Sequence, residues 1–307
     1  MAKAKIAVIG AGRMGHSIAF RFAWAGHPVA VFDAVPQMRQ SLPDRVRAAA
    51  ALVEADARCL ESIAAHESLE AAVAGADWVI EAVPEILPLK QELFAELDRL
   101  TPPTVILTSN TSTIPIHDIS LHVLNKQRVV GTHFWNPAHV LKLVEVVQME
   151  EENLPAVEKT LALLREAGWR PFHVKRDIPG FIGNRLQHAL KQEAIALVAA
   201  GVCDGETVDE IVRLGFGARL GAIGPLEQSD LGGLESTLSI HKVLMHDLDC
   251  TREPHPLLVD LVRRGELGVK TLKGFRTWTP EKVRELEERR NAFLAEEARR
   301  AAAQYRK

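Results

Sequence analysis

The stretch KIAVIGAGRMGHSIAFRFAWAGHPVAVFD, residues 5–33, decides the fold of this chain. It begins with a short apolar run that ends at Gly10, continues with helical periodicity from Met14 to Ala25, and closes with a second apolar run, VAVFD. Short apolar runs bounded by glycine are typical of buried strands, and a glycine after a periodic segment is a common helix end. The stretch therefore predicts a βαβ unit of about 30 residues, which implies a parallel sheet.

Three glycines in the first turn, Gly10, Gly12 and Gly15, follow the pattern G-x-G-x-x-G. Between a strand and a helix, the first glycine permits the tight turn, the second lets the backbone approach a pyrophosphate, and the third lets helix and strand pack closely. The helix N-terminus adds free N–H groups and positive potential. A glycine turn without a ligand is the alternative, and the strand and helix that flank the motif favour a dinucleotide site.

Asp33 ends the second strand of this unit, near the spacing of about 20 residues after the glycines at which an acid binds the ribose of a dinucleotide. Its carboxylate would accept hydrogen bonds from both ribose hydroxyls and would repel a 2′-phosphate. The sequence therefore predicts NAD as the cofactor in preference to NADP.

The alternation of apolar runs and helical segments continues beyond this unit. Ala-rich helices are predicted over residues 36–75, and further strands over 78–83, 104–110, 128–134, 141–147 and 171–175. Helical segments lie between most of these strands, as in proteins that place helices on both faces of one sheet. Residues 1–178 therefore predict a Rossmann-type, doubly wound α/β domain with a mostly parallel sheet.

The pattern changes at Pro179, beyond which helical periodicity is present and no convincing strand is found. Helices are predicted over residues 181–200, 206–214, 225–248, 256–264 and from 280 to the C-terminus. Residues 179–307 thus predict a second, all-helical domain. Its last segment mixes acidic and basic residues at helical spacing around one apolar stripe, which is typical of a solvated helix docked on one side.

Composition excludes several classes of protein. The 307 residues are 47% hydrophobic and 25% charged, as in an ordinary globular chain. A net charge of -3 without a strongly basic segment argues against nucleic acid as a partner. The three cysteines lie far apart without a C-x-x-C pair, so we expect no disulfide framework, no metal site and a reducing, cytoplasmic location. We also expect neither a signal peptide nor a membrane helix.

A dehydrogenase must remove a proton from an alcohol while hydride leaves, and histidine is the usual base near neutral pH. Among twelve histidines, His133 ends a predicted strand, at the edge where ligand crevices of such sheets open. Glu145 lies in the next predicted strand among apolar residues, where a buried carboxylate needs a partner. The residues alone leave two interpretations of Glu145 open: a partner of His133, or an exposed position on an edge strand.

Six spaced motifs, in the same order and over almost the whole chain, resemble those of the 3-hydroxyacyl-CoA dehydrogenase family. They are GxGxMG at 10–15, SNTS at 109–112, HFWNP at 133–137, LVEV at 143–146, PGFIGNR at 179–185, and KT at 270–271 followed by GF at 274–275. The resemblance implies an NAD-dependent dehydrogenase that converts an L-3-hydroxyacyl compound to its 3-oxo form by hydride transfer. It also implies a homodimer and a place in fatty acid metabolism.

The resemblance assigns roles to individual residues. His133 is implied to be the general base, and Glu145 its orienting and charge-stabilising partner. Ser112 and Asn184 are implied to hold the reacting oxygen. Residues implied to lie at the cofactor or the cleft are Gly10, Gly12, Arg13, Met14, Gly15, Asp33, Glu85, Lys90, Asn110, Asn136 and Lys270. From the residues alone, the alternatives are that Ser112 is a cap and that Asn184 hydrogen-bonds a neighbouring carbonyl.

The segment after Asp33 departs from the family pattern. Family members that use CoA esters carry a long helical hairpin with basic groups there, and here the interval between Asp33 and Ser62 is short. We therefore place a CoA ester first and keep a free hydroxy acid, such as carnitine, gulonate or a pyridine carboxylate, as the alternative substrate. Two other interpretations stay open: a 6-phosphogluconate-like hydroxyacid dehydrogenase, and an NAD-binding structural or sensing protein without turnover.

Overall fold

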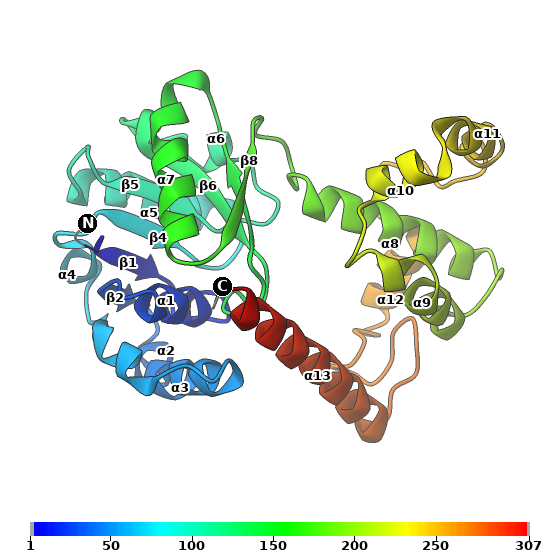
Figure 1. Cartoon of the computed structure of the whole chain (residues 1–307), viewed down its shortest axis with the longest axis horizontal. Helices are drawn as coiled ribbons and strands as arrows, with labels where there is room; N and C mark the ends of the chain where they lie inside the picture. The colour runs from blue at the N-terminus through cyan, green and yellow to red at the C-terminus, as the bar shows by residue number, and fades with distance from the viewer. Residues whose placement is uncertain (1–2, 306–307) are drawn as a thin grey trace. The chain divides into compact units, whose positions relative to one another are not determined.

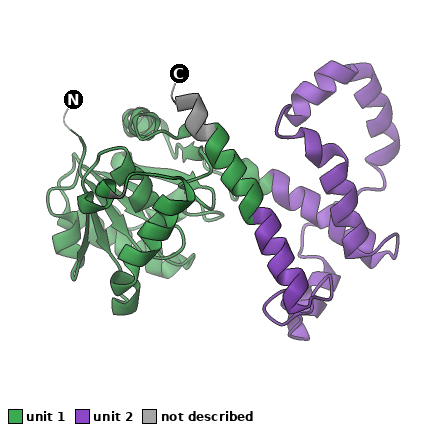
Figure 2. Cartoon of the chain, turned by 60° about the horizontal axis from the view of Figure 1, so that its bottom comes forward, with its two compact units in different colours: residues 1–185, 291–307 green, residues 186–290 purple. Residues whose placement is uncertain are grey.

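The computed structural model describes residues 3–305, except for the side chains of residues 57 and 301–305. The chain divides into two compact units, which Figure 2 distinguishes by colour. Unit 1 comprises residues 1–185 and 291–307, and unit 2 comprises residues 186–290.

Unit 1 is built on one eight-stranded sheet with the strand order β3-β2-β1-β4-β5-β6-β7-β8 (Figure 1). The strands are β1 Ile6–Ile9, β2 Val29–Phe32, β3 Ile63–His66, β4 Trp78–Glu81, β5 Ile106–Ser109, β6 Val129–Phe134, β7 Leu143–Val147 and β8 Arg170–Val174. Neighbouring strands are parallel except β6 and β7, which are antiparallel. This is the expected doubly wound arrangement, in which ligands bind at the carboxyl ends of the central strands.

Helices cover both faces of this sheet. They are α1 Gly15–Trp24, α2 Pro36–Gln40, α3 Leu42–Leu52, α4 Leu69–Val73, α5 Leu87–Leu100, α6 Ile116–Ile119 and α7 Leu154–Glu166, with short 3-10 helices at Ala57–Ser62, Lys126–Arg128 and Glu151–Asn153. In β1, Ile6 and Val8 pack in one buried cluster with α1, α3 and α7. Ala7 and Ile9 pack in a second cluster with α4, α5 and α6. The strand reads as a continuous apolar run because both of its faces are buried.

The edge strand β3 was not predicted, because residues 36–75 read as helical throughout. Its sequence, IAAH, has a single β-branched residue and lacks the pattern that marks the other strands. It pairs in parallel with β2, where Ile63 lies opposite Val29. Pairing with a neighbouring strand therefore decides the structure here, where local preference is weak.

The described elements of unit 2 are helical. They are α8 Gly183–Ala199, which begins in unit 1, α9 Gly205–Leu214, a 3-10 helix Phe216–Arg219, α10 Pro225–Gly232, α11 Leu234–Leu244, α12 Pro256–Arg263, and α13 Pro280–Tyr305, which ends in unit 1. The single helix predicted over 225–248 is wrong. Two helices replace it because Gly233 has a left-handed backbone (φ 87°), which interrupts the helix between α10 and α11.

The last helix, α13, crosses from unit 2 into unit 1, and its residues from Asn291 onward group with the sheet. This differs from the expected assignment of all residues after 178 to the second domain. Ala298 of α13 is buried with 8% of its surface exposed, which accounts for part of this grouping, whereas Phe293 of the predicted apolar stripe is 64% exposed. Between residues 3 and 305, none of the helices combines the length and apolar character that crossing a membrane requires.

Candidate functional site

The turn between β1 and α1 has the geometry that its glycines predict. Gly10 has a positive φ of 100°, and a Cβ atom there would lie 2.5 Å from the carbonyl oxygen of Ala82. A Cβ atom on Gly15 would lie 1.7 Å from the carbonyl oxygen of Gly10. Gly12 differs, because a Cβ atom there would meet nothing within 4 Å. The fold therefore requires Gly10 and Gly15, whereas Gly12 leaves space above the turn that a ligand can approach.

A cavity of about 970 Å³ opens at the carboxyl ends of the central strands of unit 1. Eight of the residues assigned to the site line it: Gly10, Gly12, Arg13, Met14, Asp33, Glu85, Asn110 and Ser112. Most of the other lining residues are apolar, including Phe32, Val83 and Leu89, and the remainder are Ser68, Glu70, Glu92 and Glu96. A concave, mostly apolar space with a few polar groups is typical of a cofactor site.

Asp33 lies at the end of β2 and is held by two backbone N–H groups. The N–H of Ala11 donates to Oδ2 at 2.7 Å, and that of Val35 donates to Oδ1 at 2.9 Å. Arg39 donates to the backbone carbonyl of Asp33 at 2.5 Å, so a guanidinium lies close by that sequence spacing did not reveal. The carboxylate is fixed at the wall of the cavity, where it can still accept further hydrogen bonds.

His133 and Glu145 are brought together by the one antiparallel pairing of the sheet. They lie directly opposite each other in β6 and β7, and His133 Nδ1 is 2.7 Å from Glu145 Oε2. Both residues are buried, with 5% and 3% of their surface exposed. Since β8 covers the far side of β7, Glu145 is not on an edge strand, and its carboxylate is in contact with the imidazole of His133.

The second oxygen of Glu145 accepts from the chain at the start of α8. The backbone N–H groups of Ile182 and Gly183 donate to Oε1 at 2.9 and 3.0 Å. Burial alone would raise the pKa of Glu145, but the hydrogen bond from His133 and these two N–H groups together lower it below the ordinary value. An ionised Glu145 accepts the Nδ1 proton of His133, which leaves Nε2 of the imidazole free to take up a proton.

Two aromatic rings that were not assigned to the site flank His133. The ring centroids of Trp135 and Phe181 lie 5.4 and 5.8 Å from that of the imidazole. A Cβ atom on Gly183 would lie 2.4 Å from Trp135, so this glycine lets the α8 terminus approach the indole. Both aromatic residues belong to motifs quoted above, and their apolar character gave no sign of a place beside the histidine.

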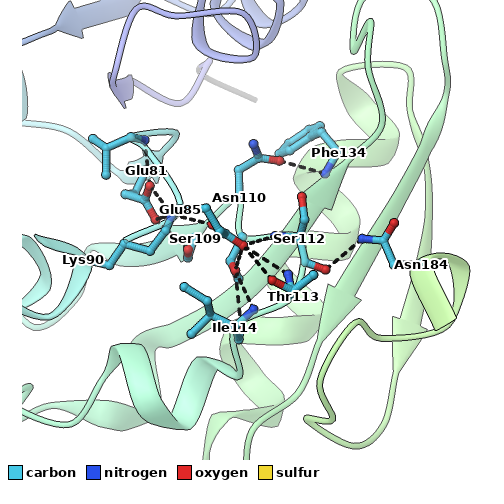
Figure 3. Close-up of polar contacts among 12 residues, drawn as sticks. Glu81, Glu85, Lys90, Ser109, Asn110, Ser112, Thr113, Ile114, Phe134 and Asn184 are labelled. Atoms are coloured by element: carbon cyan, nitrogen blue, oxygen red, sulfur yellow. Dashed lines mark hydrogen bonds and ion pairs between the residues drawn. The ribbon is translucent and has the colours of Figure 1, made fainter. Parts of the chain in front are cut away.

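The turn at residues 111–113 is shaped by Glu85, as Figure 3 shows. Glu85 Oε1 accepts from the hydroxyl of Thr111 at 2.6 Å and from the backbone N–H groups of Ser112 and Thr113 at 2.8 and 3.1 Å. Burial favours a raised pKa for Glu85, yet these hydrogen bonds and the charge of Lys90 together lower it. Asn184 Nδ2 donates to the carbonyl of Ser112 at 2.8 Å, which is the carbonyl alternative considered from sequence.

Other residues assigned to the cofactor or the cleft fall in different places. Asn110 Oδ1 accepts from the backbone N–H of Phe134 at 3.0 Å, which joins the cavity wall to the strand end that carries His133. Asn136 is exposed and outside the cavity wall. Lys90 is wholly buried beside Glu85, with no exposed surface. Lys270 lies in unit 2 and is not among the residues that line the cavity of unit 1.

Comparison with known proteins agrees with this geometry. Residues 5–178 match the NAD-binding domain of 3-hydroxyacyl-CoA dehydrogenase, and residues 180–278 match the C-terminal domain of the same family. The chain belongs to the 3-hydroxyacyl-CoA dehydrogenase family. It is therefore an NAD-dependent dehydrogenase that acts on a CH–OH group. The family, the α/β fold with a helical second part, and the NAD cofactor expected from the sequence are confirmed.

Two relatives are named for different activities. The chain is 33% identical over 303 residues to the 5-formyl-3-hydroxy-2-methylpyridine 4-carboxylate 5-dehydrogenase of Mesorhizobium japonicum, covering 97% of this chain and 96% of the relative. It is 38% identical over 280 residues to a probable 3-hydroxybutyryl-CoA dehydrogenase of Bacillus subtilis, covering 88% and 96%.

A solved structure of an NAD+-dependent 5-formyl-3-hydroxy-2-methylpyridine 4-carboxylic acid 5-dehydrogenase is similar to this chain along nearly its whole length. The TM-score is 0.89 at 31% identity, with 98% of this chain and 99% of that chain covered. The family match ends at residue 278, so α13 lies outside it.

Proposed function

We propose that the protein oxidises the hydroxyl group of a 3-hydroxyacyl compound to the 3-oxo form, with His133 as general base. The observation that carries the proposal is the buried contact of 2.7 Å between His133 and Glu145 at the strand end beside the cavity. The neutral imidazole takes the hydroxyl proton on Nε2, and Glu145 stabilises the imidazolium that forms. NAD, when bound, supplies the acceptor for the hydride that leaves the same carbon.

The residues of the cavity fit a dinucleotide. The open space above Gly12 and the N-terminus of α1 suit a pyrophosphate, and Asp33 suits a ribose with free hydroxyls. We further propose that Arg13, Met14, Glu85 and Asn110 contact the cofactor, because the first two follow the glycine turn and all four line the cavity. We keep Asn136 and Lys270 as proposed contacts on the resemblance alone.

Ser112 and Asn184 are proposed to hold the reacting oxygen. Ser112 lines the cavity, and the amide of Asn184 donates to its carbonyl, which holds the two residues together. A hydroxyl and an amide N–H can each donate to the oxygen that becomes a carbonyl. This arrangement would orient the carbon–oxygen bond of the substrate towards Nε2 of His133.

The substrate could be a CoA ester or a free acid, and different observations favour each. Family membership favours a CoA ester. A free acid is favoured by the segment after β2, where α3 packs against α1 through buried Leu42, Val46 and Ala49 and does not extend as a hairpin. The similarity to the pyridine carboxylate dehydrogenase over 97% of the chain supports the free acid as well. We propose that the protein gains little binding from the CoA group.

Trimming the thioester tests this proposal. We expect acetoacetyl-pantetheine to be reduced with a kcat/KM within about tenfold of that for acetoacetyl-CoA, because no hairpin is present to bind the nucleotide portion. Rates with 5-formyl-3-hydroxy-2-methylpyridine 4-carboxylate, L-carnitine and L-gulonate, followed by NADH absorbance, complete the panel. A fall of a hundredfold or more on trimming, about 2.7 kcal/mol, would show that CoA is bound.

The cofactor preference has its own test. We expect NAD to bind much more tightly than NADP, because Asp33 would face the 2′-phosphate. Replacing Asp33 with Ser should weaken NAD binding by about 1 to 3 kcal/mol and improve NADP binding, since the guanidinium of Arg39 lies nearby. Fluorescence titration with both reduced cofactors measures this. Equal affinities in the parent protein would remove Asp33 from the proposed role.

We also propose that the protein is a homodimer joined through unit 2. The described hydrophobic residues of this unit that are buried are Val208 and Leu261. In contrast, α11 leaves Leu234, Leu238 and Val243 exposed by 61%, 56% and 69%. Each large apolar side chain contributes roughly 1.5 to 3 kcal/mol when it is buried. Helices that bury so few of them are therefore expected to pack their exposed apolar side chains against another protein surface. A second copy presents the same apolar surface.

Light scattering after gel filtration tests the dimer. The parent should have twice the mass of one chain, and Leu238→Glu should shift it to the monomer or unfold unit 2. Leu124→Glu, at an 88% exposed position of unit 1, is the control and should remain dimeric. A monomeric parent with full helical content at low concentration would contradict the proposal.

The proposed location is the cytoplasm. Cys59, Cys203 and Cys250 are free in the structure, as suits a reducing compartment. Fractionation with an antibody against the protein checks this.

A further inference from the structure

A buried cluster of charges lies behind the turn that carries Ser112. Glu81 ends β4, and Lys90 lies on α5, and neither side chain has exposed surface. Lys90 Nζ donates to Glu81 Oε1 and Oε2 at 2.7 and 2.9 Å, and it is 3.2 Å from Glu85 Oε2. Figure 3 shows the three side chains together.

Both carboxylate oxygens of Glu81 accept two hydrogen bonds each. Besides Lys90, its Oε1 accepts from the backbone N–H of Val83 at 2.7 Å, and its Oε2 accepts from the hydroxyl of Ser109 at 2.6 Å. Burial raises the pKa of Glu81, while Lys90 and these hydrogen bonds act in the opposite direction. The carboxylate thus ties the ends of β4 and β5 to α5 and fixes the position of the Lys90 ammonium.

Lys90 determines how the carboxylate of Glu85 is turned. Glu85 Oε2 faces the ammonium of Lys90, which leaves Oε1 for the N–H groups of Ser112 and Thr113. A carboxylate that lacked this cation could rotate or move into the cavity that it lines. The contacts therefore form a continuous path from Glu81 through Lys90 and Glu85 to the turn at Ser112.

We infer that Glu81 and Lys90 are positioning residues for the reaction, which act through Glu85 on the turn that carries Ser112. The inference rests on the proposed role of Ser112. Lys90 has no surface with which to touch a cofactor, which distinguishes this role from the cofactor contact implied by the resemblance. A buried ion pair is weak evidence for stability, because apolar residues of similar volume often replace one without loss. Such a replacement would, however, remove the cation that orients the carboxylate of Glu85.

The test is the double variant Glu81→Gln/Lys90→Met, which leaves no unpaired buried charge. Gln can still accept from Val83 N–H, and Met fills the space of the lysine stem. The assay uses acetoacetyl-CoA or 5-formyl-3-hydroxy-2-methylpyridine 4-carboxylate, whichever the parent turns over faster. We expect kcat at saturating NADH to fall at least tenfold, and the isotope effect for transfer of deuterium to or from the cofactor to increase.

The matched control is Asp98→Asn. Asp98 also lies on α5 and forms a buried ion pair with Arg128 at 2.6 Å, but this pair has no contact with Glu85. The control should lose thermal stability and keep kcat and the isotope effect of the parent. If the double variant does not fold, Glu81→Gln alone supplies the comparison, because it loosens the hold on Lys90 without changing a residue that lines the cavity.

Three outcomes overturn the inference. A parental kcat and isotope effect in the double variant would make the cluster purely structural. NADH affinity weakened tenfold or more, with kcat at saturating NADH unchanged, would make Lys90 a cofactor contact. An equal loss of kcat in Asp98→Asn would attribute the effect to α5 as a whole. A fully active His133→Gln would instead contradict the proposed function, whatever the double variant shows.

Discussion

Replacing His133 with Gln should lower kcat by about a hundredfold or more, because no other described side chain is hydrogen-bonded to Glu145 and could take up the hydroxyl proton. NADH affinity should be unchanged, since His133 does not line the cavity. Steady-state rates and fluorescence titration measure both quantities. A fully active His133→Gln enzyme would place the base elsewhere.

Glu145→Gln should cost nearly as much as the loss of His133. The amide keeps the shape of the side chain but loses the charge that stabilises the imidazolium. Because the two residues act as one unit, the double variant should be little worse than either single variant. Strictly additive losses in this cycle would show that Glu145 and His133 contribute independently.

The pH profiles of the two directions should have opposite slopes. Oxidation needs the neutral imidazole of His133 and reduction needs the imidazolium, so oxidation should rise and reduction should fall as pH increases. The pKa of Glu145 lies below its ordinary value, so Glu145 stays ionised near neutral pH. Parallel profiles for kcat/KM in the two directions would contradict the assignment.

Local patterns were sufficient to predict the parts of the fold that lie close in sequence. Residues 5–33 predict β1, α1 and β2, because alternate residues of β1 are buried on opposite faces and the glycines end each segment. β3 could not be predicted in this way, since its pairing with β2 compensates for a weak pattern. The division at Gly233 was missed although Gly232 and Gly233 stand together in the sequence, and such a pair is a turn signal.

The site depends more strongly on register and on contacts distant in sequence. His133 could be found at a strand end, but its contact with Glu145 follows from the antiparallel register of β6 and β7. The burial of Lys90 follows from the packing of α5 behind β4, where Glu81 meets it. Spacing along the chain contains no information on such contacts, and the place of Lys90 at the cofactor or the cleft was implied by the resemblance alone.

The second large effect concerns the glycines of the first turn. Gly15→Ala should prevent correct folding or lower the free energy of unfolding by ~3 kcal/mol or more, because its Cβ atom would lie 1.7 Å from the carbonyl oxygen of Gly10. Gly12→Ala should leave stability within about 0.5 kcal/mol of the parent, since its Cβ atom meets nothing within 4 Å. Urea unfolding measures both.

For cofactor binding, unlike for stability, we expect the large effect at Gly12. The Cβ atom of Gly12→Ala would occupy the space proposed for the pyrophosphate, so NADH affinity should fall at least tenfold, about 1.4 kcal/mol, in a protein that is otherwise folded like the parent. Gly221→Ala is the control, because its Cβ atom also meets nothing within 4 Å and Gly221 lies in unit 2. It should change neither stability nor affinity. Parental NADH binding by Gly12→Ala would mean that the dinucleotide does not approach this turn, and the cavity beside it would need another ligand.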